Sequence, residues 1–378
     1  MRAISPNYIG MTTRREFIRK SSLGIGAATL STAAFTSLSP ACAQAADRSL
    51  GIALVGLGNY ATNQLLPALQ ETQHIKLAGI VTGTPAKAQK WQSEQSLKAS
   101  NIYNYETYDQ LADNPEIDVV YVVLPNSMHA EYTIRALEAG KHVICEKPMG
   151  LSVAECDQMI AAAKKADKTL AIGYRLHYEP HNQEAMRLAG SDEMGKVKLF
   201  EGGFGFQSGD PNQWRLKKAL AGGGALMDVG IYVLQAARFT TGEEPIAVTA
   251  QEFKTDPVKF AEVDETIFWQ MEFPSGAIAS CTTSYNARTE YMRVACEKGR
   301  FEMGPCYGYG GIRGSVNNKE MDFPAINQQA AHMDGIARHI LTGEPLLNVG
   351  GEEGRRDMLV IEAIYKAIET GGRVEIAR

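Results

Sequence analysis

The chain has 378 residues, of which 44% are hydrophobic, 38 are basic and 43 are acidic, giving a net charge of −5. This composition is typical of a globular protein, and the length suggests two domains. The acidic balance argues against nucleic-acid binding, which requires a basic face, and the six cysteines lack zinc-ligand spacing, so we expect no metal site.

Residues 1–45 are predicted to be an export signal. Arg14 and Arg15 resemble the twin-arginine signal, and the uncharged stretch that follows Lys20 is rich in Ala, Ser, Thr and Gly. We expect cleavage after Ala45, which changes the charge to −9 because five basic residues and one acidic residue are lost. The prediction is a periplasmic protein that uses the twin-arginine export machinery and leaves the membrane after cleavage. A membrane anchor, or lipidation at Cys42, is the alternative.

From residue 50 to residue 173, short apolar strands alternate with helical stretches, which is typical of β–α–β units around a parallel sheet. We expect strands at 50–56, 75–81, 119–124, 142–145 and 169–173, and helices at 63–73, 85–95, 127–139 and 153–166. The predicted fold class is therefore α/β, beginning with a Rossmann dinucleotide-binding domain over residues 46–172.

After residue 173 the pattern becomes rich in strands, which predicts an α+β domain with a large, mostly antiparallel open sheet over residues 173–350. We expect β-rich segments at 196–207, 246–253, 263–273, 276–285, 290–297 and 299–303, with a helix at 224–241. A C-terminal helix over 352–370 is expected to end at Gly371, within a final unit of residues 351–378. The partly apolar alternation of the sheet predicts pairing with another subunit, as a homodimer or homotetramer.

Glycines at the end of the first strand predict a dinucleotide site. Gly56, Gly58 and Ala61 form a G-x-G-x-x-A pattern between this strand and a helix. The first glycine allows a tight turn, the second lets the backbone approach a pyrophosphate at the helix N-terminus, and the small third residue allows close packing. The predicted cofactor-binding residues here are Gly56, Leu57, Gly58, Asn59, Tyr60 and Ala61.

The end of the second strand selects the cofactor, because NAD-binding proteins place an acidic residue there to hold the ribose 2′-hydroxyl. Residues 81–87 contain no carboxylate. Thr82 can donate a hydrogen bond to a 2′-phosphate, and Lys87 can reach it as a cation. The sequence therefore favours NADP over NAD.

Three further residues form a candidate catalytic group. Lys147 follows a buried strand at the carboxyl edge of the parallel sheet, where ligands bind in doubly wound folds. Asp228 and Tyr232 are four residues apart and therefore lie on one face of a helix, behind the glycine-rich residues 222–224. His177 and His181 share a helical spacing, but with no third ligand evident they predict no metal site.

At this point the chain resembles the glucose–fructose oxidoreductase/inositol dehydrogenase family, and within it most closely the glucose–fructose oxidoreductase branch. Glu146-Lys147-Pro148 marks the superfamily, and a tyrosine four residues after Asp228, where a histidine is commoner, marks the branch. The matching stretches are 55–61, 124–131, 139–149, 172–180, 213–216, 221–232 and 351–354.

The resemblance implies roles for individual residues. Tyr232 would accept and donate the proton at the reacting carbon, Lys147 would orient the sugar hydroxyl, and Asp228 would hydrogen-bond the sugar. A free tyrosine has a pKa near ~10, so the nearby Lys147 cation would be needed to favour the phenolate. The residues implied to border the cofactor are Tyr105, Leu124, Pro125, Asn126, His129, Glu146, Lys147, Arg175, Trp214 and Arg215. The expected substrate-binding residues are Lys147, Arg175, His177, Tyr178, Asp228 and Tyr232.

These observations predict an NADP-containing sugar oxidoreductase. One aldose would be oxidised at C1 to a lactone, and a second sugar would be reduced to a polyol with the same bound cofactor. A redox-neutral nicotinamide-dependent glycosidase and an ordinary NADP-dependent aldose dehydrogenase are the alternatives in the same fold. A non-catalytic sugar-binding protein is disfavoured because Lys147, Asp228 and Tyr232 are all present.

Overall fold

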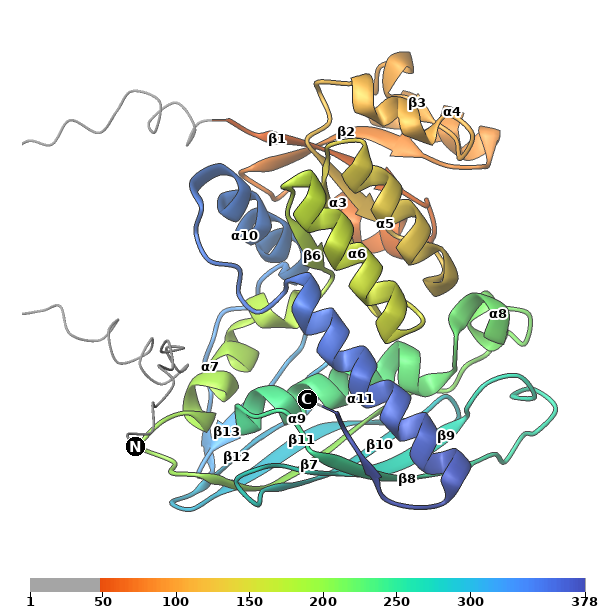
Figure 1. Ribbon diagram of the computed structural model, residues 1–378. Coiled ribbons are helices and arrows are strands. Elements are labelled where there is room, and N and C mark those ends of the chain that lie inside the picture. The colour runs from red at the N-terminus through yellow and green to blue at the C-terminus, as the bar shows by residue number, and fades with distance from the viewer. Residues whose placement is uncertain (1–47, 378) are drawn as a thin grey trace, which may run out of the picture. The chain divides into compact units, whose positions relative to one another are not determined.

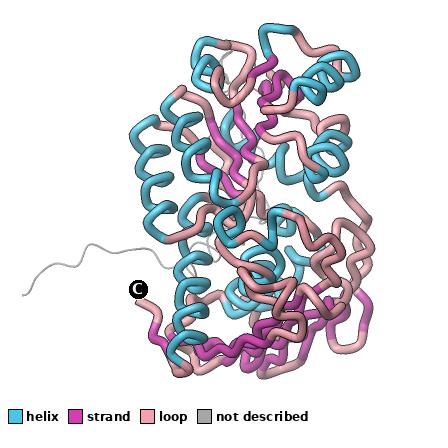
Figure 2. The backbone as a smooth tube through the Cα atoms, turned by 90° about the vertical axis from the view of Figure 1, so that its right-hand side faces the viewer, coloured by secondary structure: helices cyan, strands magenta, loops and turns pink. Residues whose placement is uncertain are grey.

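A computed structural model describes residues 48–377, which belong to one compact unit. The predicted signal, its cleavage site and Cys42 lie outside the described residues. The described part contains two β-sheets, which are the two groups of magenta strands in Figure 2. The α/β class with a second, mostly antiparallel sheet is confirmed.

The first sheet, sheet A, has six parallel strands in the order β3-β2-β1-β4-β5-β6. Its strands are β1 (Leu50–Val55), β2 (Ile75–Val81), β3 (Ile102–Tyr103), β4 (Val119–Val122), β5 (His142–Cys145) and β6 (Leu170–Ile172). Both β1 and β4 are buried along their whole length, as expected for central parallel strands. The strand order reverses between β1 and β4, which is the point where doubly wound sheets bind ligands at their carboxyl edge.

The helices of this half connect its strands, and Figure 1 shows α5 and α6 in front of sheet A. They are η1 (Ala61–Leu65), α3 (Leu66–Ala68), α4 (Pro85–Glu94), η2 (Ala99–Asn101), η3 (Tyr108–Asp113), η4 (Asn126–Met128), α5 (His129–Glu138) and α6 (Val153–Ala166). The predicted helix at 63–73 is displaced: helical turns begin directly after Gly58 and end before Leu69. The glycine loop leads straight into this helix, so the helix N-terminus faces the loop.

The second sheet, sheet B, has nine strands in the order β14-β13-β12-β11-β7-β10-β9-β8-β15. All neighbouring pairs are antiparallel except β7 with β10. The strands are β7 (Val197–Gly205), β8 (Ala247–Phe253), β9 (Thr266–Glu272), β10 (Ile278–Ser284), β11 (Thr289–Cys296), β12 (Arg300–Met303), β13 (Gly314–Val316), β14 (Lys319–Glu320) and β15 (Val374–Glu375).

Helices cover one face of sheet B. The helices that follow β6 in the chain are η5 (Arg175–Tyr178), α7 (Pro180–Ala189), η6 (Trp214–Leu216), α8 (Lys218–Ala221), η7 (Leu226–Gly230), α9 (Ile231–Thr241), α10 (Gln328–Thr342) and α11 (Gly351–Thr370). Within this set α9 packs on β7, and α11 packs on both β8 and α6, so that α11 links the two sheets (Figure 1). Among the described residues, one helical stretch, Lys218–Thr241, is long and apolar enough to cross a membrane, and 78% of its most apolar window is buried, as expected of a core helix.

The helices α7 and α10 were not expected from the sequence, although both carry start signals. Pro180 begins α7, and the side chain of Glu179 accepts a hydrogen bond from the backbone N–H of Asn182. Asn327 caps α10 in the same way, and Gly343 ends that helix in a left-handed conformation. The buried faces of both helices include polar residues, and this hides the helices from a reading that relies on apolar spacing; these residues are His181, Asn182, Gln328, Gln329, His332 and Asp334.

Candidate active site

The glycine loop after β1 has the shape that a dinucleotide requires. Gly56 has a φ of +93°, and a Cβ there would lie 2.5 Å from the carbonyl oxygen of Val123, so only glycine fits. At Gly58 no heavy atom lies within 4 Å of such a Cβ, which leaves open space where a phosphate can approach the backbone. Ala61 is fully buried behind the loop. These residues therefore fit a bound dinucleotide.

The end of β2 lies beside this loop. The exposed Lys87 donates a hydrogen bond from Nζ to the carbonyl oxygen of Leu57, 3.0 Å away. The hydroxyl of Thr82 accepts a bond from the backbone N–H of Thr84 at 3.3 Å, and the ring of Tyr105 lies against Gly83. The structure thus brings the two predicted selectivity residues to the glycine loop.

His129 connects the loops that follow β4 and β5 through hydrogen bonds to both. The ring nitrogens of His129 lie 2.7 Å from the carbonyl oxygen of Pro148 and 2.9 Å from that of Leu124. Burial lowers the pKa of His129 to about 4, so the ring is neutral and donates to one of these oxygens at neutral pH. His129 is 1% exposed and therefore supports the predicted cofactor pocket rather than lining it. Asn126 donates to the carbonyl oxygen of Ala221, which joins the loop to α8.

Glu146 lies beneath the same pocket. Its carboxylate accepts a hydrogen bond from the hydroxyl of Tyr121 at 2.6 Å, and a Cβ at Gly173 would lie 2.5 Å from its Oε1 atom. Burial raises the pKa of Glu146, although Tyr121 and Lys147 oppose this shift. The glycine at position 173 is thus needed for Glu146 to pack there.

Lys147 and Asp228 meet between the two sheets, as the sequence predicts. Lys147 Nζ lies 3.2 Å from Asp228 Oδ1 and 2.5 Å from the carbonyl oxygen of Asp228. The other carboxylate oxygen lies 3.1 Å from Arg215 Nε and accepts a bond from the hydroxyl of Tyr285 at 3.0 Å. Burial alone would raise the pKa of Asp228, but Lys147 and Arg215 lower it to about 2. Asp228 therefore stays ionised with two cations beside it.

Tyr232 follows Asp228 where η7, a π-helical turn of a kind often found at functional sites, runs into α9. Lys147 Nζ lies 4.8 Å from the centroid of its ring, and Arg175 Cζ lies 5.3 Å from it. Burial would lower the pKa of Arg175, but interactions with Tyr232, including a side-chain hydrogen bond, raise it. Tyr232 is 9% exposed, and its ring therefore lies against two cations in a mostly buried site.

Two other predicted substrate residues have contacts elsewhere. His177 Nδ1 lies 2.9 Å from the carbonyl oxygen of Leu347, and its ring packs edge-on against Phe239. The ring of Tyr178 packs against His332 on α10. These contacts do not bring either residue to Lys147, Asp228 or Tyr232. Trp214, by contrast, lies under Arg215, whose Cζ is 4.6 Å from the centroid of the indole.

The sequence analysis missed two tyrosines of the site. Tyr285, fully buried after β10, donates to Asp228. Tyr309 lies in the loop after β12, with Arg175 Cζ 4.5 Å from its ring centroid. The alternation of glycine and tyrosine over residues 307–311 is a signal that could have indicated a functional loop. Within residues 48–377, no group of three or more His, Cys, Asp or Glu is placed to hold a metal ion.

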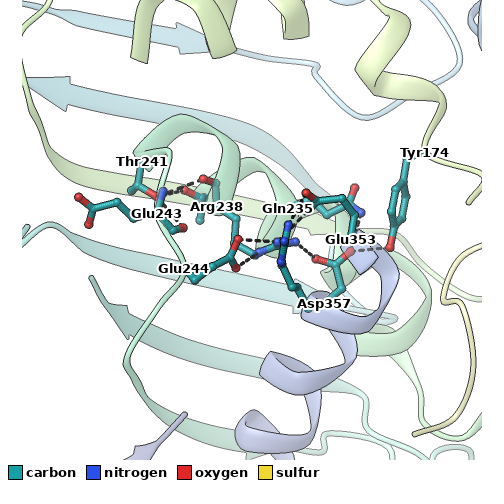
Figure 3. A network of polar contacts seen from close by, with 10 residues as sticks. Tyr174, Gln235, Arg238, Thr241, Glu243, Glu244, Glu353 and Asp357 are labelled. Carbon is teal, nitrogen blue, oxygen red and sulfur yellow. Dashed lines mark hydrogen bonds and ion pairs between the residues drawn. The ribbon is translucent and has the colours of Figure 1, made fainter. Parts of the chain in front are cut away.

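A second buried polar cluster lies further along α9 (Figure 3). Arg238 binds Asp357 and Glu353 of α11, the latter at 2.9 Å. Asp357 also accepts bonds from Tyr174 and Gln235, each at 2.6 Å. Burial raises the pKa of Asp357 to about 6, although Arg238 opposes the shift. This cluster fixes α9 to α11 and to Tyr174, the neighbour of Arg175.

Comparisons with known proteins agree with this architecture. The model of the oxidoreductase family with an NAD-binding Rossmann fold matches residues 50–174, and that of the GFO/IDH/MocA C-terminal domain matches residues 182–302. D-xylose 1-dehydrogenase (NADP+) of Haloarcula marismortui is 30% identical over 344 residues, which cover 88% of this chain and 94% of that protein. The crystal structure of aldose-aldose oxidoreductase from Caulobacter crescentus complexed with glycerol is 45% identical with a TM-score of 0.83, covering 87% of this chain and 100% of that chain.

Proposed function

Because the chain belongs to the GFO/IDH/MocA family of oxidoreductases, we propose that it is a periplasmic NADP-containing enzyme that oxidises one aldose at C1 to a lactone and reduces a second sugar to a polyol. Its coarser identity, a nicotinamide-dependent sugar oxidoreductase, follows from the family and from the sugar dehydrogenases related to it. The observation that carries the proposal is the Lys147, Asp228 and Tyr232 cluster at the carboxyl edge of sheet A. The similarity to an aldose-aldose oxidoreductase supports the use of two sugars.

The residues at the carboxyl edge of sheet A fit the cofactor. When bound, the cofactor would supply the hydride chemistry, namely acceptance of a hydride from one sugar and its donation to the carbonyl carbon of another. The backbone at Gly56 and Gly58 would hold the pyrophosphate, and Thr82 and Lys87 would hold a 2′-phosphate. What supports NADP over NAD is the lack of a carboxylate in residues 82–87 together with the ammonium of Lys87 beside the glycine loop.

Tyr232 transfers the proton of the reacting hydroxyl. Its phenolic oxygen takes this proton during oxidation and returns it to the carbonyl oxygen during reduction. Lys147 and Arg175 stabilise the negative charge that develops there, because both cations lie against the tyrosine ring in a mostly buried site. Asp228, held ionised by Lys147 and Arg215, presents oxygen atoms that can accept hydrogen bonds from sugar hydroxyls.

Export supports a cycle that regenerates its own cofactor. Arg14 and Arg15 resemble the signal of a route that carries folded proteins with their cofactors, and the periplasm is not expected to hold a free NADP pool. An exported NADP enzyme that released its cofactor after each oxidation would stop after one turnover. Reduction of a second sugar on the same enzyme removes this limit.

The experiment is a product analysis without added nucleotide. The protein purified from the periplasm is denatured and the released nucleotide is identified, and the native protein is then incubated with glucose alone and with glucose plus xylose. We expect released NADP(H), and equal amounts of lactone and polyol over many turnovers. An ordinary dehydrogenase would stop after one equivalent of lactone, and a redox-neutral glycosidase would cleave a glycoside with no net lactone.

An oligomer that buries the uncovered face of sheet B is part of the proposal. Large apolar side chains lie on that face: Leu199 is 39% exposed, Phe268 52% and Ile278 46%. Figure 2 shows helices on only one side of sheet B among residues 48–377. An apolar face of this kind favours association. Light scattering at micromolar concentration should give a dimer or tetramer, and a monomer would contradict this part.

A further inference from the structure

The loop between β12 and β13 is held in one conformation from two sides. The carboxylate of Glu290 accepts hydrogen bonds from three successive backbone N–H groups, those of Cys306, Tyr307 and Gly308, at 3.0, 2.7 and 2.8 Å. From the other side Arg175 donates to the carbonyl oxygens of Tyr307 at 2.5 Å and Gly308 at 3.0 Å. The residue that follows these anchors, Tyr309, is therefore presented on a rigid base.

The two tyrosines of this loop differ in their surroundings. Tyr307 is 1% exposed and packs against Phe204, whereas Tyr309 is 51% exposed. The guanidinium of Arg175 lies 4.5 Å from the ring centroid of Tyr309, and the ring of Tyr60 from the glycine loop lies 6.0 Å away. Tyr309 is thus a half-exposed aromatic ring that is backed by a cation and reaches from sheet B to the dinucleotide loop.

We propose that the exposed face of Tyr309 is the platform on which the ring of a cyclic sugar stacks beside Tyr232. This inference rests on the proposed function. A pyranose has C–H groups on its faces and hydroxyls at its rim. One face can therefore pack on an aromatic ring while the hydroxyls form hydrogen bonds with polar side chains. Lys147, Asp228 and Tyr232 supply the polar partners, and Tyr309 supplies the apolar face next to Arg175. Because the ring is already fixed, little side-chain freedom is lost on binding.

With Tyr309 in this position, the oxidation and reduction half-reactions depend on its ring to different degrees. Oxidation at C1 to a lactone begins with the cyclic form of the aldose, whose faces can stack. Reduction to a polyol acts on the open-chain aldehyde and yields a product without a ring. Tyr309 therefore selects the cyclic donor and contributes little to binding of the open-chain acceptor and product.

The test compares two ligands that differ in ring closure. One is 1,5-anhydroglucitol, a pyranose that lacks the C1 hydroxyl, and the other is glucitol, the open-chain polyol. Their binding to the cofactor-loaded protein is measured by calorimetry for the wild type, Tyr309→Leu and Tyr309→Phe, and the Kd for NADPH is measured by fluorescence. We expect Tyr309→Leu to weaken binding of the cyclic ligand about tenfold, which corresponds to about 1.4 kcal/mol, and that of glucitol less than about twofold. NADPH should bind all three proteins alike, and Tyr309→Phe should bind both sugars like the wild type.

Several outcomes would overturn the inference. If Tyr309→Leu weakens binding of both sugar ligands equally, or leaves binding of the cyclic one unchanged, Tyr309 does not select for a sugar ring. A matching rise in the Kd for NADPH assigns Tyr309 to the cofactor, and an equal loss in Tyr309→Phe assigns the effect to the hydroxyl. Tyr309→Gln is a second variant for the case that Tyr309→Leu does not fold. If the wild type neither binds the sugars nor oxidises aldoses, the proposed function fails as well. If the wild type does both and the variants show no preference for the ring, only the inference about Tyr309 fails.

Discussion

The buried polar clusters at the two ends of the helix 226–241 have opposite charge balances. At its start, Asp228 faces the cations of Lys147 and Arg215, and despite burial they lower the pKa of this carboxyl to about 2. Near its end, Arg238 is shared by several carboxylates, and burial raises the pKa of Asp357 to about 6. The two pKa values therefore shift in opposite directions: Asp228, whose side chain is 18% exposed, has two cations beside it, whereas the fully buried Asp357 shares Arg238 with other carboxylates.

The difference separates a site that can do chemistry from one that holds the fold. A surplus of positive charge beside Tyr232 can stabilise an anionic oxygen that appears during proton transfer. In the cluster around Arg238 the carboxylates outnumber the cations, and its hydrogen bonds join α9, α11 and Tyr174 (Figure 3). We therefore expect removal of the Tyr232 hydroxyl to reduce activity with little loss of stability, and removal of Arg238 from the second cluster to reduce stability.

The largest effect should come from Tyr232→Phe, which keeps the ring and removes only the hydroxyl. Single-turnover reduction of bound NADP by an aldose should fall by roughly 10²–10⁴, the usual contribution of a positioned acid/base group. Lys147→Met should be comparably harmful, and the double variant should be far from additive because the two residues act as one unit. For Tyr232→Phe, thermal unfolding and nucleotide content serve as controls and should stay close to wild type. A near-normal rate in Tyr232→Phe would move the proton-transfer role to another residue, with Asp228 as the next candidate.

Removing the shared cation of the second cluster should affect stability instead. Arg238→Met leaves the fully buried carboxylate of Asp357 without its cationic partner, whereas Glu353 keeps Arg356, and the loss should lower the free energy of unfolding by about 3–5 kcal/mol in denaturant titrations. Arg187→Met is a matched control, because Arg187 pairs with Glu184 on the surface and should cost at most about 1 kcal/mol. The comparison between the clusters fails if Arg238→Met is as stable as this control.

A negative charge placed at the cofactor end of the site should weaken binding of NADP. In Thr82→Asp the new carboxylate would repel a 2′-phosphate and also pair with Lys87, so the Kd for NADP should rise by roughly one to three powers of ten. Thr82→Val removes the hydroxyl without adding charge and should have a smaller effect. Both values are measured by titration of the protein freed of nucleotide, and an unchanged Kd in Thr82→Asp would place the 2′-phosphate elsewhere.

The smallest effect is a dependence of stability on pH. The pKa of Asp357 rises from 3.8 to about 6 on folding, so its proton is bound more tightly in the folded state. Its contribution to stability is complete below pH 3.8 and is lost as the pH rises to about 6, by up to roughly 3 kcal/mol. Because asparagine resembles the protonated carboxyl, the unfolding free energies of the wild type and Asp357→Asn should be most similar at low pH and diverge as the pH rises through this range, and parallel curves would refute the assignment. Asp228→Asn should show the opposite sign, because a pKa lowered to about 2 contributes stability that is lost as the pH falls below 3.8.

The sequence predicted the elements that have strong local patterns. The buried strands of sheet A, the helix Val153–Ala166 and the strand His142–Cys145 lie where the apolar runs place them, because burial on both faces leaves a continuous apolar signal. Lys147, Asp228 and Tyr232 could be named because a lysine at the end of a buried strand and a four-residue helical spacing are local features too.

Contacts between distant segments could not be predicted in the same way. Arg238 and Asp357 are 119 positions apart, and neither residue stands out in its own helix. Tyr309 contacts Arg175 from a loop whose backbone is held by Glu290, on another strand, and by Arg175 itself. Periodicity reports which face of an element is buried but not which polar group lies opposite it, so these partners emerge only from the folded chain.

Both edges of sheet B are very short strands, a feature with consequences for how the protein behaves at high concentration. The outermost strands are β14 (Lys319–Glu320) and β15 (Val374–Glu375), each of two residues, and Lys319, Glu320 and Glu375 are exposed. A short, charged edge offers an incoming strand few backbone groups to pair with. The edges of the sheet therefore disfavour lateral extension into fibrils.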